Sequence, residues 1–116
     1  MDLVQKLQLR PGQGLEVSGT DAAAVRALAG LPTDGGPGAG LLAFAVDRAA
    51  LGGELAAVVG AASVDRLTWV AYPKAGQLGT DLNREVLAAL LTAEGVRQVR
   101  QVAVDDVWSA LRFRPV

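Results

Sequence analysis

The sequence contains no cysteine and no histidine among its 116 residues. The lack of cysteine excludes disulfide bonds, thiolate nucleophiles and cysteine-ligated zinc sites. The lack of histidine removes the commonest general base and any Ser-His-Asp triad. Any chemistry would therefore have to use carboxylates, lysine, tyrosine, hydroxyl groups or a cofactor. A metal ion could bind only through oxygen ligands, as magnesium and calcium do; we expect neither a metal ion nor a cofactor.

The chain also lacks an excess of one charge. Its formal net charge is -1, with both signs interspersed. Proteins that bind nucleic acid usually carry a basic stripe or patch, so we expect no nucleic-acid partner. The longest apolar runs, "GLLAFAV" and "LAAVVGAA", are too short to span a bilayer, and the N-terminal residues do not have the pattern of a signal peptide. We therefore expect a cytoplasmic protein without a membrane partner.

What the sequence does contain is a globular composition, with 51% hydrophobic and 20% charged residues. A chain of this length suits one domain, residues 1–116, with a real hydrophobic core. Residues 15–19, 41–46, 66–73, 96–104 and 107–114 have the patterns of strands. Helices are predicted over 20–30, after Asp47, and over 80–94, where Thr80 is the expected N-cap and Gly95 the stop. The segment 31–40 is rich in glycine and proline and is predicted to be a loop.

The order of these segments predicts the fold class. Strands that alternate with helices favour an α/β protein, and continuous apolar runs favour strands covered on both faces. Two polar residues, Asp105 and Asp106, separate the last two strands, which predicts a hairpin. We therefore expect a mostly parallel, Rossmann-like three-layer sheet with a C-terminal antiparallel hairpin.

Parallel strands would place their carboxyl ends at one edge of the sheet, where open α/β sheets bind ligands. Thr20-Asp21, Asp47-Arg48 and the loop after Lys74 would lie there. The start of the helix at residue 80, with a lysine nearby, could bind an anion. The predicted ligand-binding residues are Lys74, Thr80, Asp81, Arg84, Asp105 and Asp106.

Simpler explanations stand beside this prediction. Thr80-Asp81 is sufficiently explained as a helix cap, Lys74 as a solvated loop charge, and Asp105-Asp106 as a turn. Asp105 and Asp81 could together hold a divalent ion, although nothing in the pattern requires it. On the last strand, Trp108, Arg112 and Arg114 point to one side, and they are the predicted interface residues. Trp69 and Trp108 could equally be packing residues.

Two stretches, "WVAYPK…GTDLNREVL" and "VRQVAVDDVWSALRFRP", together resemble a small bacterial domain family of unknown function. Its members carry a Trp-x-Ala-Tyr/Trp-Pro-Lys loop, a Thr-Asp-Leu helix start and a closing Asp-Asp/Glu-x-Trp-Ser-x-Leu-Arg-Phe run. The resemblance covers nearly all of the chain except residues 31–40. Since the family has no established activity, the resemblance implies a fold and leaves the function open.

The layout also resembles an abbreviated S-adenosylmethionine-dependent methyltransferase domain, which ends in a helix and an antiparallel hairpin. The glycine-rich first loop of those enzymes is replaced here by Gly19 followed by Thr20 and Asp21. The first hypothesis is therefore a non-catalytic binding or interaction module, acting as a homodimer through the free edge or the Trp108 and Arg112 face of the last strand. The alternatives are a protein that binds a small ligand or anion, and a degenerate methyltransferase-like enzyme.

Overall fold

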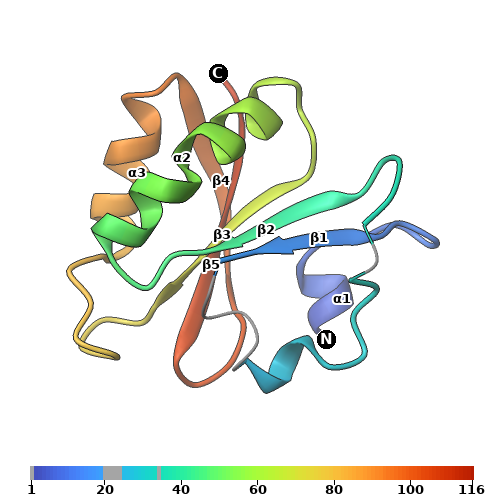
Figure 1. Ribbon diagram of the computed structural model, residues 1–116, viewed down its shortest axis with the longest axis horizontal. Coiled ribbons are helices and arrows are strands. Elements are labelled where there is room, and N and C mark those ends of the chain that lie inside the picture. Colours follow the sequence, from blue (N-terminus) through green and yellow to red (C-terminus); the bar gives the residue numbers. More distant parts are fainter. Residues whose placement is uncertain (1, 20–24, 34) are drawn as a thin grey trace.

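The computed structural model describes residues 2–19, 25–33 and 35–116. Within these ranges the chain forms a five-stranded sheet in the order β1-β2-β3-β5-β4 (Figure 1). The strands are β1 (Leu15–Ser18), β2 (Gly40–Phe44), β3 (Thr68–Pro73), β4 (Val96–Ala103) and β5 (Trp108–Pro115). The helices are α1 (Leu3–Lys6), α2 (Arg48–Ser63), α3 (Arg84–Thr92) and a short 3-10 turn, η2 (Arg26–Leu28).

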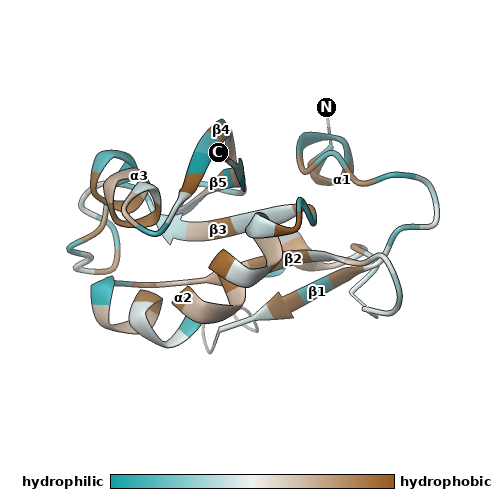
Figure 2. Cartoon of the chain, turned by 90° about the horizontal axis from the view of Figure 1, so that it is seen from above, coloured by the Kyte–Doolittle hydropathy of each residue, from teal (hydrophilic) through white to brown (hydrophobic). Residues whose placement is uncertain are grey.

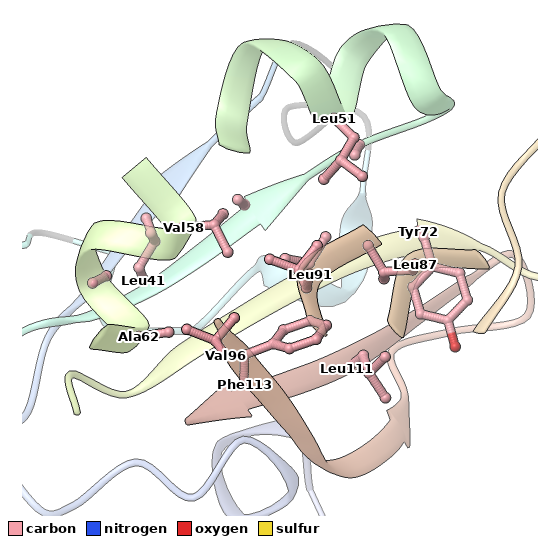
Figure 3. Packing of buried hydrophobic residues seen from close by; sticks show 14 of the residues in the cluster. Leu41, Leu51, Val58, Ala62, Tyr72, Leu87, Leu91, Val96, Leu111 and Phe113 are labelled. Carbon is pink, nitrogen blue, oxygen red and sulfur yellow. The ribbon is translucent and has the colours of Figure 1, made fainter. Parts of the chain in front are cut away.

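Strands β2 and β3, which lie inside the sheet, are buried along their whole length, as their continuous apolar runs predict. Alternate residues of β2 belong to two separate clusters: Leu41 packs under α2 and α3, whereas Phe44 packs on the opposite face. Figure 3 shows the first cluster from close by. Residues of α1 and of the segment around η2 cover the second cluster, and Leu7, at the end of α1, is fully buried in it. The sheet therefore has a hydrophobic core on each face.

The prediction of a mostly parallel, Rossmann-like three-layer sheet is wrong. Strands β1, β2 and β3 are parallel neighbours, but β5 is antiparallel to both β3 and β4. The described sheet is therefore mixed, with two parallel and two antiparallel pairs. The reason is the place of the C-terminal hairpin, since β5 inserts between β3 and β4 instead of adding at the edge. The resemblance to a methyltransferase-like layout is not tested by this order and remains a prediction.

The burial of the two hairpin strands explains the insertion. The outward-facing positions of β4 are mostly exposed, and Figure 2 shows the hydrophilic colour of this strand. Strand β5 is buried over most of its length, from Trp108 to Phe113. The more apolar strand gains more by lying between two neighbours, and the polar strand tolerates the edge. The expected free edge on the last strand is therefore also wrong: β1 and β4 are the edge strands of the described sheet.

Most element predictions are confirmed, with two differences. The helix expected from Thr80 begins only at Arg84, where Asn83 is the N-cap and accepts a hydrogen bond from the Val86 N–H (2.8 Å). The helix expected over 20–30 falls partly on residues 20–24, outside the described residues, and its described part contains only η2. Asp47 caps α2 as expected, through the Ala50 N–H (2.8 Å).

In the part of the chain that is described, no helix has the length and apolarity needed to cross a bilayer.

Candidate functional site

A hollow of about 420 Å³ lies where β3 ends and α3 begins. It sits on the face of the sheet that α2 and α3 cover, and β4 and β5 form its far side. Its size falls in the range of small-molecule sites. It is lined by Tyr72, Lys74, Ala75, Asn83, Arg84, Glu85, Gln101 and Ser109, of which all but Ala75 carry a polar group.

Tyr72 connects this hollow to the hydrophobic core. The residue is only 2% exposed, and its ring packs with the leucines of the first cluster while its oxygen points away from them (Figure 3). The Gln101 Nε2 donates a hydrogen bond to the Tyr72 hydroxyl oxygen (2.8 Å). The Arg84 Nη1 in turn donates to the Gln101 Oε1 (3.2 Å). A chain of hydrogen bonds therefore runs from the core to an exposed guanidinium.

The environment of Tyr72 keeps its hydroxyl neutral. Burial is the largest influence and raises the pKa of Tyr72 above its ordinary value of 10.0. Hydrogen bonds from Gln101 and Ser109 and the positive charge of Arg84 act in the opposite direction, because they favour the phenolate. Ser109 is the cross-strand partner of Tyr72 on β5. Because the hydroxyl oxygen accepts from the Gln101 Nε2, its own proton is left to donate.

Two of the predicted ligand-binding residues, Lys74 and Arg84, line this hollow together. The backbone N–H of Lys74 donates to the Val107 carbonyl (2.7 Å), which fixes the end of β3 against the hairpin. The ion pairs found within residues 2–19, 25–33 and 35–116 are Arg66–Glu16 and Arg114–Asp65, so neither cation of the hollow pairs with a described acid. Glu85 is the acidic residue that lines the same space.

Thr80 and Asp81 do not line the hollow. The Thr80 Oγ1 accepts a hydrogen bond from the Leu82 N–H (3.0 Å), within its own loop. The Asp81 Oδ1 accepts from the Arg48 N–H (2.8 Å) at the start of α2. Its negative charge therefore interacts favourably with the positive N-terminal end of α2. The sequence suggested this interaction for α3 instead. Both residues hold the loop that precedes α3 in place.

Asp105 and Asp106 lie in the hairpin turn between β4 and β5. The Asp105 Oδ1 accepts from the N–H groups of Val107 (2.8 Å) and Trp108 (2.7 Å), which closes the turn. Asp106 is exposed. The described residues contain no group of three or more acidic side chains placed to hold a metal ion. Thr20-Asp21, which was also expected at this edge, lies outside the described residues.

The three predicted interface residues differ in their surroundings. Trp108 is 5% exposed, and its ring meets Phe44 edge to face with the centroids 5.0 Å apart. In this chain it is therefore a core residue, whereas Arg112 and Arg114 are only half-buried. The Arg112 Nη1 donates to the Gln8 Oε1 (2.6 Å), and Arg114 pairs with Asp65. Both arginines lie on the sheet face opposite the hollow, next to α1.

Sequence reasoning missed Tyr72, Gln101 and Ser109 as members of the site. Ser109 follows the alternation of β5, which could place it on one face, whereas Gln101 reaches the same face only because β4 has a register shift between Gln98 and Arg100. Their contact with Tyr72 depends on β5 lying between β3 and β4, and no local sequence pattern predicts that strand order.

Comparisons of this chain with protein-family models, with curated proteins and with solved structures find no match.

Proposed function

We propose that this protein is a binding module that holds a small anionic ligand in the hollow between β3 and α3. One observation carries the proposal: Lys74 and Arg84 line the same hollow, and neither forms an ion pair with a described acidic side chain. Two cations beside one space attract an anion more strongly than either does alone. The resemblance to a bacterial family of unknown function remains a prediction and does not indicate which ligand binds.

The other side chains of the hollow define how the ligand would be held. Arg84 offers a planar fork of donors that suits a carboxylate or phosphate, and Lys74 offers a compact positive charge. The neutral Tyr72 hydroxyl can donate a further hydrogen bond from the apolar side of the hollow. Glu85 would repel a second negative charge, or accept a hydrogen bond from a ligand hydroxyl. The arrangement therefore favours a small ligand that carries one anionic group and one neutral polar group.

Thermal unfolding in the presence of small anions tests the proposal. The panel would contain phosphate, sulfate, small hydroxy acids and nucleotides. An anion at one hundred times its dissociation constant stabilises the native state by about 2.7 kcal/mol, which is several degrees for a domain of this size. We expect Lys74→Gln and Arg84→Gln to remove this shift while unfolding near the wild-type temperature without ligand.

Arg26→Gln is the matched control, because Arg26 is exposed and lies in η2 on the opposite face of the sheet. It should leave the anion-dependent shift unchanged. If no anion shifts the unfolding temperature, or if the shift persists in both hollow variants, the proposed site is wrong.

A further inference from the structure

Four arginines gather on one face of the hairpin that β4 and β5 form. In the register of the two strands, Arg97 lies opposite Arg114, and Arg100 lies opposite Arg112. Residues directly opposite each other in an antiparallel pair project to the same face. We call the surface made by these four residues the arginine face. It lies on the side of the sheet that α1 covers, because Arg112 contacts Gln8 and Val102 packs into the second cluster.

A bulge in β4 makes this arrangement possible. Arg97 and Arg100 are three residues apart, so in a regular strand they would point to opposite faces. The register shifts between Gln98 and Arg100, and this inserts one extra residue. As a result Arg100 joins Arg97 on the α1 side, whereas Gln101 points to the α3 side and reaches Tyr72. The bulge therefore determines which side chains lie on each face of the strand.

The charge of the arginine face is only partly compensated. Arg114 binds Asp65 through two hydrogen bonds, Nε to Oδ1 (3.0 Å) and Nη2 to Oδ2 (2.9 Å). The remaining three arginines form no ion pair with a described acid. The Nε of Arg112 is buried and has no hydrogen-bond partner among the described residues. Like charges opposite each other in a sheet are destabilising, and this hairpin carries two such pairs.

We propose that the arginine face binds an extended acidic segment of a partner protein. Charge complementarity carries the proposal, because carboxylates would neutralise cations that the described chain leaves unpaired. Arg112, which forms no ion pair, and Arg114, which shares its charge with Asp65, are two residues apart on one strand, a spacing of about 6.8 Å. Acidic side chains at alternate positions of an extended peptide have the same spacing, so they can pair with successive guanidinium groups.

Other occupants fit the arginine face less well. All five aromatic residues of the chain, Phe44, Trp69, Tyr72, Trp108 and Phe113, are buried, so none can stack on the bases of a single strand. A second copy that paired through the β4 edge would set one arginine row against another.

Fluorescence anisotropy with a labelled peptide of alternating glutamate and serine tests this inference. The probe would be titrated at low salt and at about 0.15 M ionic strength, since binding between exposed charges weakens as salt screens them. We expect binding at low salt, no binding of the same peptide with glutamine in place of glutamate, and an affinity about tenfold lower for Arg97→Gln/Arg100→Gln. Both arginines are exposed, so this variant should fold.

Arg84→Gln, in the hollow on the other face, is the control and should bind the acidic peptide as the wild type does. Arg100→Gln alone gives a second, milder variant with an intermediate loss. Tighter binding of a single-stranded oligonucleotide of equal charge would overturn the inference in favour of nucleic acid. Failure of the acidic peptide to bind, or binding that both variants leave unchanged, would also overturn it. None of these results depends on the small-anion site being correct.

Discussion

At the scale of single residues, Tyr72 joins the hydrophobic core to the candidate site. Its ring belongs to the core, and its hydroxyl lies at the wall of the hollow. Two charged neighbours act on this hydroxyl in opposite directions. Arg84 lowers the pKa of Tyr72 and Glu85 raises it, although burial has the largest effect. The titration of Tyr72 therefore reports on the side chains that would hold the ligand.

Because Tyr72 is the single tyrosine of the chain, the absorbance of its phenolate can be followed directly. We expect a pKa above 10.0 in the native protein. Arg84→Gln should raise the pKa further, and Glu85→Gln should lower it, because the two changes remove opposite charges. Since the folded-state pKa is the higher one, the stability that neutral Tyr72 contributes is present below pH 10 and is lost as the pH rises through the folded-state value. Equal shifts in both variants would contradict the described geometry.

The candidate residues show what a sequence can predict at this scale. Lys74 follows an apolar strand and Arg84 stands near a helix start, so their position at one edge follows from local patterns. The same patterns predict that Thr80 and Asp81 are the first residues of that helix. The helix begins later because Asn83 takes the cap through the Val86 N–H, a local contact that the sequence could have indicated. The burial of Leu82 just before it is a tertiary effect that no local pattern shows. The hydrogen bond that Asp81 accepts at the start of α2 could not be predicted for the same reason.

At the scale of elements, the apolar runs and the caps predict most strands and helices, including β2, β3 and α2. The order of the strands is not local information. The contrast between apolar β5 and polar β4 could have indicated which of them lies inside the sheet, because burial favours the apolar strand. The alternation of helices and strands predicts a parallel arrangement, and that rule does not indicate where a terminal hairpin inserts.

A pair of glycine substitutions tests the packing of β1 against β2. Gly19 has φ +103°, and a Cβ atom there would clash with the carbonyl oxygen and the Cβ atom of Phe44. Gly19→Ala should therefore lower the free energy of unfolding by at least about 2 kcal/mol. Gly52, inside α2, has open space around it, so Gly52→Ala should raise the free energy by about 0.5–1 kcal/mol. Denaturant unfolding measures both changes, and a Gly19→Ala protein as stable as the wild type would contradict this packing.

At the scale of the whole molecule, a nearly neutral chain can still carry local positive surfaces. The sequence shows only the sum, a net charge of -1. Folding brings Lys74 and Arg84 to one side of the sheet and the four residues of the arginine face to the other. We expect two separate anion-binding surfaces with different partners, a small ligand on the α3 side and an acidic segment on the α1 side. Neither surface follows from composition.

An NMR titration of the isotope-labelled protein with the most stabilising small anion tests the central claim most directly. Backbone amide signals report every described non-proline residue at once, so the experiment locates the bound anion without any substitution. The account predicts shifts that saturate and are centred on Lys74, Arg84 and Gln101. Shifts centred on Arg100 and Arg112, or shifts that rise without saturation over the whole surface, would contradict a small-anion site in the hollow.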